Sequence, residues 1–299
     1  MIKPQKIDIH AHASLFPHLD PGLPMDGQKM PGAEELIAMY DRLNIEKGVL
    51  LPLVGIEAQR TPLTSEACKV IADRYADRFF WFCGMDPRMG DNTPDCDLSF
   101  FLNHYKALGA RGVGELTANL YADDPMMDNL FAHCEECDMP VIIHIGPQIG
   151  GCYGIVDEVG LPRIEKMLKK HPRLTLIGHS QPFWSEISAG NTDELRNTYP
   201  RGKVIPGRLT ELMREYGNLY CDLSAGSGAN AMMRDPEHAA RFMEEFSDRI
   251  LYGCDICATK NTHPFVFDAF LDKLLEEGML TMENYTKIVR GNALRVLKV

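Results

Sequence analysis

Eight short apolar runs recur along the chain, and each is followed by a loop and a segment with helical periodicity. The runs are rich in Val, Ile, Leu and aromatic residues and are bounded by Gly, Pro or polar turns, as is typical of buried parallel strands. Their starts lie roughly 30 to 45 residues apart, which is the length of a strand, a loop, a helix and a return loop. They occupy residues 6–12, 47–53, 79–87, 110–117, 140–146, 174–180, 219–225 and 250–256.

Segments with helical periodicity fill the gaps between these runs. The repeated alternation predicts an α/β protein, a (β/α)8 TIM barrel that residues 1–299 form as a single domain. Residues 281–297 are expected to form a closing helical tail. A doubly wound open sheet is the alternative fold, but its Gly-rich phosphate loop after the first strand is absent. The other expected helices occupy residues 31–45, 64–78, 97–109, 125–138, 161–172, 238–249 and 263–278.

The charge balance restricts the kinds of partner. The chain has 31 Lys and Arg against 42 Asp and Glu, a net charge of −11. This balance argues against broad binding to nucleic acid or to an anionic membrane, since both need a basic face. No stretch approaches the roughly twenty apolar residues of a spanning helix, and the first residues lack the apolar run of a secretory signal. We therefore expect a cytoplasmic protein with a small-molecule substrate.

Nine cysteines are spread between Cys68 and Cys257 without the dense spacing of a disulfide framework. This usage suits a reducing compartment. Two pairs, 134/137 and 254/257, have the CxxC spacing. About 117 residues separate them, far more than the roughly 12 to 20 of a zinc finger or ribbon. A structural zinc site or a redox role is therefore not favoured.

Polar side chains gather at the carboxyl ends of the predicted strands, where a TIM barrel places its active site. Four of the ten histidines lie there, together with one Glu and one Asp. The remaining histidines fall in loops or helices, where a solvated or packing role is expected. The six residues at the strand ends are His10, His12, Glu115, His144, His179 and Asp255.

The period of two along a strand predicts where these side chains point. In residues 6–12, Asp8, His10 and His12 share one face, and the apolar residues between them share the other. The polar face is expected to point into the barrel and the apolar face toward the helices. The same parity turns His144 and His179 inward. In the strand at residues 110–117, it places Glu115 on the same face as Val113.

Six polar groups that converge on one barrel mouth are costly to bury, since a desolvated polar group without a partner costs a few kcal/mol. Any one histidine could instead be a hydrogen-bonded core residue. For the whole set, a divalent metal is the simpler explanation, because imidazole nitrogen and carboxylate oxygen are ligands that zinc favours and that manganese or iron tolerate. The sequence therefore predicts one or two divalent ions, with zinc as the first choice.

Four motifs resemble those of the amidohydrolase superfamily, in its branch of amidohydrolase-related hydrolases and decarboxylases. They are DIHAH at residues 8–12, IIHIG around His144, IGHS around His179 and YGCD ending at Asp255. The resemblance spans essentially the whole chain. It implies that the two histidines of DIHAH bind the first metal with His144, and that Asp255 binds the metal or its water.

The resemblance leaves the number of metals open. In mononuclear members His179 would polarise substrate or activate water, whereas in binuclear members it would bind the second metal. Many binuclear members place a carboxylated Lys or a Glu at the end of strand four, as a bridge between the metals. This chain offers Glu115 and no Lys. The alternative for Glu115 is a salt-bridged or substrate-facing carboxylate.

The predicted reaction is hydrolysis of an amide, ester or lactone bond in a small molecule by a metal-activated water. Asp255 would act as general base and then general acid, and His179 would stabilise the oxyanion. The alternative is a metal-dependent decarboxylase or lyase of an unsaturated or aromatic carboxylic acid. A deoxyribonuclease similar to the TatD-like branch is disfavoured by the net charge, and a barrel without catalysis by the intact ligand set.

Four further residues follow the predicted strands and are candidates for substrate binding. Trp184 follows the sixth strand, Tyr153 lies in the Gly-rich loop after the fifth, and Lys260 follows the eighth. Arg208 lies on the connection from Gln181 to the next strand, whose length of about 37 residues is typical of a lid or substrate wall. Its guanidinium could meet a carboxylate or phosphate. The sequence does not decide between a monomer and a homo-oligomer.

Overall fold

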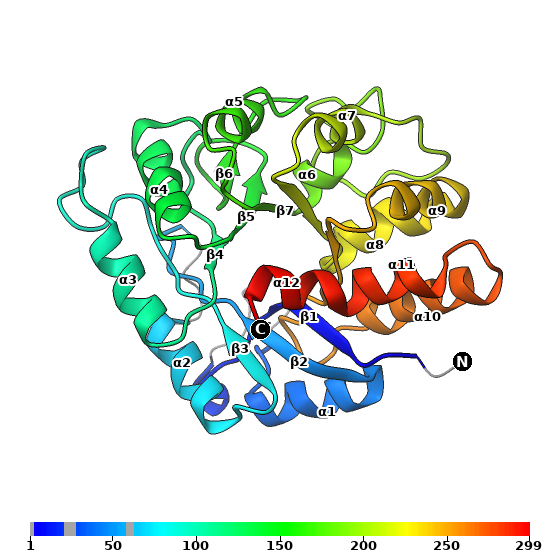
Figure 1. Ribbon diagram of the computed structural model, residues 1–299, viewed down its shortest axis with the longest axis horizontal. Coiled ribbons are helices and arrows are strands. Elements are labelled where there is room, and N and C mark those ends of the chain that lie inside the picture. Colours follow the sequence, from blue (N-terminus) through cyan, green and yellow to red (C-terminus); the bar gives the residue numbers. More distant parts are fainter. Residues whose placement is uncertain (1–2, 21–27, 58–62) are drawn as a thin grey trace.

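The computed structural model describes residues 3–20, 28–57 and 63–299. Parallel strands form a ring with helices outside it, which confirms the predicted (β/α)8 barrel (Figure 1). The strands are β1 (Lys6–Ala11), β2 (Ile45–Leu50), β3 (Phe79–Trp81), β4 (Val113–Leu116), β5 (Val141–Gly146), β6 (Ile155–Val156), β7 (Leu176–His179), β8 (Leu219–Asp222) and β9 (Ile250–Leu251).

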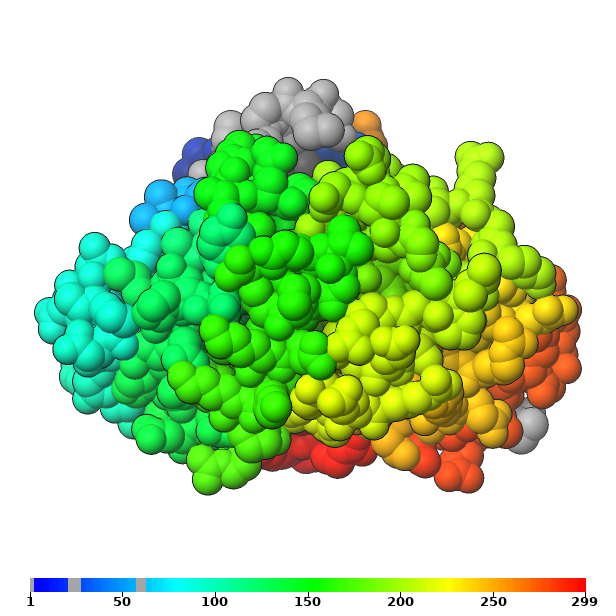
Figure 2. Space-filling model, turned by 90° about the horizontal axis from the view of Figure 1, so that it is seen from above, coloured from blue at the N-terminus to red at the C-terminus, as the bar shows by residue number. Residues whose placement is uncertain are grey.

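The helices follow the strands in the alternating order expected of this fold. They are η1 (Pro17–Leu19), α1 (Ala33–Leu43), α2 (Ser65–Arg74), α3 (Ser99–Ala107), α4 (Pro125–Glu136), α5 (Pro162–Lys170), α6 (Gln181–Ser185), α7 (Arg208–Glu215), α8 (Ala225–Met233), α9 (Pro236–Glu245), α10 (His263–Glu276), α11 (Met282–Thr286), η2 (Lys287–Gly291) and α12 (Asn292–Leu297). On the face drawn in Figure 2, the segments coloured green to yellow form a continuous surface.

The ring consists of two hydrogen-bonded sheets joined at two seams. One sheet has the order β1-β2-β3 and the other β4-β5-β7-β8-β9, with the short β6 paired to β5. Single parallel bridges close the ring, from Cys83 to Val113 and from Ala11 to Ile256. Strand β6, the short helix η1 and helices α6, α7 and α8 were not predicted. The sequence of α8, AGSGANAMM, shows no apolar stripe and holds two glycines, which disfavour helix.

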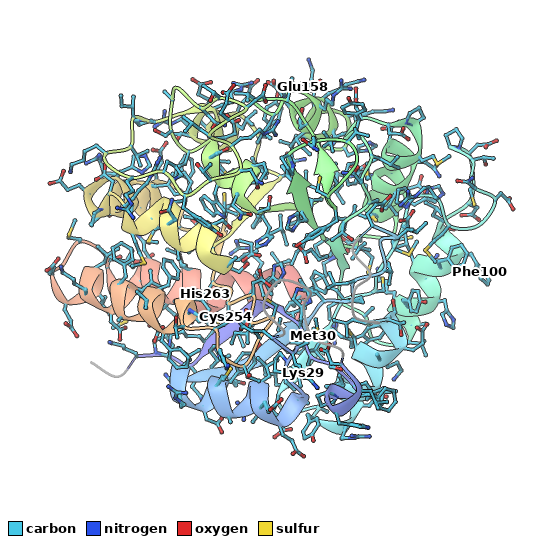
Figure 3. The ribbon with its side chains drawn as sticks, turned by 180° about the vertical axis from the view of Figure 1, so that it is seen from behind. Lys29, Met30, Phe100, Glu158, Cys254 and His263 are labelled. Carbon is cyan, nitrogen blue, oxygen red and sulfur yellow. The ribbon has the colours of Figure 1, made fainter. Side chains whose placement is uncertain are left out.

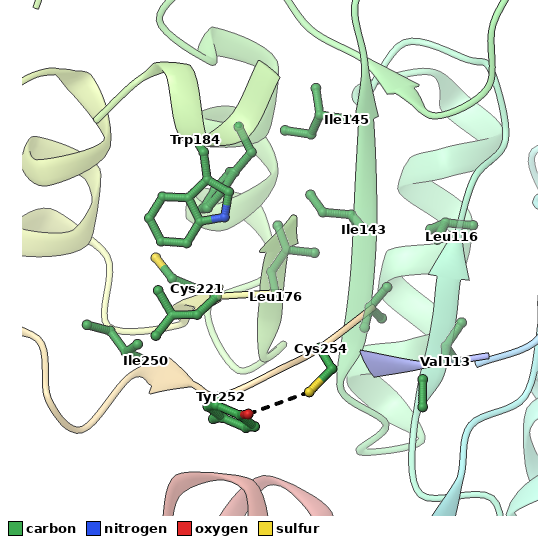
Figure 4. Packing of buried hydrophobic residues seen from close by; sticks show 14 of the residues in the cluster. Val113, Leu116, Ile143, Ile145, Leu176, Trp184, Cys221, Ile250, Tyr252 and Cys254 are labelled. Carbon is green, nitrogen blue, oxygen red and sulfur yellow. Dashed lines mark hydrogen bonds between the residues drawn. The ribbon is translucent and has the colours of Figure 1, made fainter. Parts of the chain in front are cut away.

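Two layers of apolar side chains hold the barrel together. The inner cluster takes residues from β1, β2, β5, β7 and β9 and from no helix except α12, so it fills the ring. In Figure 1, α12 and the C-terminus lie across the centre of the ring, and the tail thus closes one end of the barrel, as predicted. The outer cluster packs the strands against the helices, as Figure 4 shows for Val113, Ile143 and Leu176.

The predicted parity of β1 is wrong in its first half. Ile7 and Ile9 belong to the inner cluster, whereas the Asp8 side chain turns away from it and meets Tyr40 of α1. The reason is a bulge, because the pairing of β1 with β2 slips between Asp8 and Ala11. An extra residue in one strand reverses the faces beyond it.

Beyond the bulge the predicted orientation holds. His10 and His12 face the mouth of the barrel, while Ala11 joins the outer layer. In β4 the register also shifts, between Val113 and Leu116. Val113 therefore packs in the outer layer although Glu115 faces the mouth, and the shared parity expected for these two residues is wrong.

All nine cysteines are thiols, as their spacing indicated. The first CxxC pair ends α4, where burial raises the pKa of both Cys134 and Cys137 and so disfavours the reactive thiolate. Within the part of the chain that the structure describes, no helix has both the length and the apolar character needed to cross a membrane.

A contact between β7 and α6 tests the outer packing. An ideal Cβ added at Gly178 would lie 2.1 Å from the ring of Phe183. We expect Gly178→Ala to lower the free energy of unfolding by about 1–3 kcal/mol through overpacking, measured by urea denaturation. Gly217→Ala is the matched control, since nothing lies within 4 Å of its added Cβ. Equal stability of the two variants would contradict this packing.

Candidate metal centre

The structure brings all six predicted strand-end residues into one cluster at the mouth of the barrel. Nε2 of His10 lies 3.2 Å from Nε2 of His12 and 3.7 Å from Oδ1 of Asp255. Both imidazole nitrogens lie 3.5 Å from Oε2 of Glu115. Figure 3 shows the ring from the end opposite α12, with Cys254, the neighbour of Asp255, near its centre.

Glu115 stands between two pairs of histidines. Its Oε2 faces His10 and His12, while its Oε1 lies 2.5 Å from Nδ1 of His144 and 3.9 Å from Nε2 of His179. The two oxygens of one carboxylate thus serve different sides of the cluster. This is the arrangement in which a carboxylate can bridge two cations.

The donor atoms fit a divalent ion. Ligands bound at about 2.1 Å from one ion lie about 3.0 to 3.4 Å from each other. The separations of 3.2 to 3.7 Å among His10, His12, Glu115 and Asp255 need only a small contraction to reach this range. Among the described residues, three overlapping groups could hold a metal, drawn from His10, His12, Glu115, His144, His179 and Asp255.

Electrostatics favour a cation at this place. Burial by itself lowers the pKa of His10, but the charges of Asp255 and Glu115, followed by Asp222, outweigh it and hold the pKa well above its ordinary value. Burial raises the pKa of Glu115, but His144 and His10 outweigh it and hold that pKa well below its ordinary value. The Glu115 carboxylate is therefore ionised, and positive charge beside it is favoured.

Asp222 is a functional residue that the sequence analysis missed. Its carboxylate is fully buried at the end of β8, and it accepts hydrogen bonds of 2.7 Å from Nδ1 of His10 and from the Ser224 hydroxyl. Nδ1 of His179 lies 3.0 Å from that hydroxyl. The lack of a side chain at Gly253 makes room for the Asp222 carboxylate, because a Cβ there would lie 2.4 Å from Oδ1.

These contacts show which ring nitrogen of each imidazole donates a hydrogen bond, because a donor must face an acceptor. His10 donates from Nδ1 to Asp222, and His12 lies 2.9 Å from the carbonyl oxygen of Leu51, which can only accept. Since Ser224 gives its hydroxyl proton to Asp222, His179 donates from Nδ1 to the Ser224 oxygen. All three imidazoles therefore turn Nε2 toward the cluster, as metal ligands do when their other nitrogen is held.

Two of the predicted substrate-binding residues do not reach the cluster. Trp184 is 2% exposed and packs in the outer layer, where its indole NH donates to the carbonyl oxygen of Asp222 (Figure 4). Arg208 begins α7 and pairs with Glu165 and Glu211. Helix α6 turns Trp184 against the barrel wall, and α7 presents Arg208 to carboxylates of α5 and of α7 itself, which position along the chain did not reveal.

The other two lie nearer the mouth. The ring of Tyr153 lies 4.6 Å from that of His144, at an angle of 51°. Lys260 lines a cavity of about 650 Å³ beside α1 and α2, with Ser14 of the loop after β1. Tyr199, which the sequence did not single out, accepts a hydrogen bond from Gln181, and the charge of Asp255 adds to burial in raising its pKa.

The pKa of His10 predicts how metal binding depends on pH. A raised pKa keeps a proton on His10 in the metal-free protein, and this proton must leave when a ligand bond forms. We expect metal affinity to rise about tenfold per pH unit for each proton displaced, measured by chelator competition between about pH 6 and pH 8. His104→Ala, on an exposed position of α3, is the control. Affinity that does not change with pH would contradict the assignment.

Asp222 gives a second prediction. Asp222→Asn should weaken metal binding about 10- to 100-fold. The amide removes the negative charge beside His10, and its NH2 group would face the Ser224 backbone N–H, from which the carboxylate Oδ1 accepts a hydrogen bond. The measurement is the dissociation constant in a competition titration. Asp124→Asn, at the first turn of α4, is the control, and equal affinities would show that Asp222 does not orient the ligands.

Similar structures share the fold. An uncharacterised TIM-barrel protein from Bordetella bronchiseptica is 20% identical, covering 98% of both chains with a TM-score of 0.64. A probable 2-pyrone-4,6-dicarboxylic acid hydrolase from Acinetobacter baumannii is 14% identical, over 99% of this chain and 100% of that one, with a TM-score of 0.61. A dihydroxybenzoic acid decarboxylase from Polaromonas, with bound manganese and the inhibitor 2-nitroresorcinol, is 14% identical over 99% and 97%, with a TM-score of 0.61.

Sequence comparison gives the family. A search of curated proteins finds no match. The family model described as amidohydrolase matches residues 7–299, from the start of β1 through the closing tail. This range contains every residue of the cluster. The chain therefore belongs to the amidohydrolase family, as its motifs predicted.

Proposed function

We propose that this enzyme is a metal-dependent hydrolase that cleaves an amide, ester or lactone bond of a small molecule. The observation that carries the proposal is the position of Glu115 between two histidine pairs, with one oxygen toward each. Such a bridge suits two divalent ions. Zinc is our first choice and manganese the second, because the donors are imidazole nitrogens and carboxylate oxygens.

The bound ions would lower the pKa of a water molecule and polarise the substrate carbonyl. Asp255 is the carboxylate placed to move the proton. Its side chain is 21% exposed, whereas those of His10, His12 and Glu115 are buried, so Asp255 lies where substrate enters. It would take a proton from the attacking water and deliver it to the leaving group.

The tautomer of His179 refines its predicted role. With Nδ1–H held by Ser224, the ring turns Nε2 toward the cluster. A lone pair serves as a metal ligand, whereas oxyanion stabilisation needs a proton on that nitrogen. This favours His179 as a ligand of a second ion over its use as an oxyanion donor.

A metal-dependent decarboxylase or lyase of an unsaturated or aromatic carboxylic acid is the second candidate. Tyr153 favours it, because its half-exposed ring beside His144 offers a flat wall for a planar acid. The structural relative from Polaromonas is a decarboxylase. This reaction would require one ion rather than a bridged pair. For either reaction we expect a cytoplasmic enzyme, without nucleic acid or membrane partners, and leave monomer and homo-oligomer open.

The experiment that tests the proposal combines metal analysis with turnover. We expect about two ions per chain in the wild type and about one in Glu115→Gln, because the bridge is lost. Asp255→Asn should retain metal and lose turnover of ester or lactone substrates about 10²- to 10⁴-fold. One ion in the wild type, with release of CO2 from aromatic acids, would replace the hydrolase proposal with the decarboxylase.

A further inference from the structure

The ring closes between its first and last strands, and this seam carries two residues of the metal centre. The amide of Ile9 donates to the carbonyl oxygen of Tyr252 at 3.0 Å, and the amide of Asp255 donates to the carbonyl oxygen of His10 at 2.8 Å. His10 lies on β1, and Asp255 follows β9. The spacing across this seam therefore sets the distance between two members of the cluster.

The buried carboxylate of Asp8 spans the same seam. Its Oδ1 accepts from the amide of His10 at 3.0 Å and from the amide of Cys254 at 2.8 Å. Its Oδ2 accepts from the Tyr40 hydroxyl at 2.6 Å. The residue is fully buried, and each oxygen has at least one donor. One atom thus joins the main chain of a histidine of the centre to the main chain of the residue before Asp255.

We propose that Asp8 is a positioning residue, whose Oδ1 atom holds the ends of β1 and β9 at the spacing that the metal centre requires. It touches neither substrate nor metal and acts through His10 and Asp255. The proposal rests on the metal centre and not on the choice between hydrolysis and decarboxylation.

The backbone at Asp255 shows why such a tie is needed. Its φ is +50°, in the left-handed region that residues with a side chain rarely adopt. A conformation of this kind persists only when the surrounding structure holds it. The bonds to Asp8 from Cys254, and to His10 from Asp255 itself, hold the chain before this φ angle, and the parallel bridge between Ile256 and Ala11 holds it afterwards.

The second oxygen of Asp8 is held by Tyr40, which reaches it because β2 has a glycine, Gly48, at the point that its side chain crosses. Asp8 pairs in register with Gly48, and a Cβ at Gly48 would lie 2.1 Å from the Tyr40 hydroxyl. The missing side chain thus lets Tyr40 reach from α1 across β2 to β1. Tyr40 orients the carboxylate, and of the two Asp8 oxygens only Oδ1 accepts hydrogen bonds from both sides of the seam.

The test compares four variants with the wild type. Asp8→Ala removes both acceptors. Asp8→Asn keeps one oxygen for the two amides, and its NH2 can donate to the Tyr40 oxygen. Tyr40→Phe leaves the tie intact. Tyr285→Phe is the matched control, because the buried Tyr285 hydroxyl has no hydrogen-bond partner among the residues that the structure describes. If Asp8→Ala does not fold, Asp8→Ser replaces it, since a hydroxyl oxygen cannot reach both amides.

Two measurements are made, hydrogen exchange of the metal-free protein and zinc affinity by chelator competition. In Asp8→Ala we expect faster exchange in the peptides of both β1 and β9 and about 10- to 100-fold weaker zinc binding. Asp8→Asn, Tyr40→Phe and Tyr285→Phe should stay within about threefold of the wild type.

The outcomes separate this proposal from the proposed function. Unchanged exchange at either strand, or unchanged zinc affinity in Asp8→Ala, would overturn the positioning role even if the wild type binds two ions. Weaker zinc binding in Asp8→Asn as well would also overturn the positioning role. The negative charge of Asp8, and not its hydrogen bonds to the two amides, would then be what the metal centre requires. A wild type that binds neither zinc nor manganese refutes the metal centre and with it the role of Asp8.

Discussion

The metal centre and the strands that carry it depend on the pairing of buried carboxylates with hydrogen-bond donors. Glu115, Asp222 and Asp8 are almost fully removed from water at one end of the barrel, and each would be costly to bury without partners. Each is met by donors that the fold supplies, namely imidazoles for the first two, and backbone amides with a tyrosine for the third. A divalent cation at the mouth would add further positive charge beside Glu115, where the pKa of the carboxyl group is held low.

This matching depends on local departures from regular strands. The bulge in β1 turns Asp8 toward α1 while His10 and His12 face the mouth. In β4 a register shift lets Glu115 face the cluster while Val113 packs outward. Glycines supply the remaining space, since Gly253 admits the Asp222 carboxylate. Irregularities of this kind concentrate where function requires side chains that a regular strand would point elsewhere.

Much of the centre could be predicted from the sequence, because parallel strands of a barrel all end at the same rim. Six polar residues at predicted strand ends meet there. Asp222 was not predicted, because the expected strand ran on to residue 225 and placed it in the interior, whereas β8 ends at Asp222. Trp184 was expected at the mouth, but the short helix α6 turns its indole onto the barrel wall.

The sequence by itself determined the order of strands and helices, the barrel, the family and the six members of the cluster, because these follow from periodicity and from motifs along the chain. Only the tertiary structure decided which nitrogen of each histidine faces the centre, that Glu115 serves two sides, and that Asp8 joins β1 to β9. The physical reason is that these are contacts between residues far apart in the chain. His10 and Asp222, for example, are separated by 212 positions and meet only because the ring is closed.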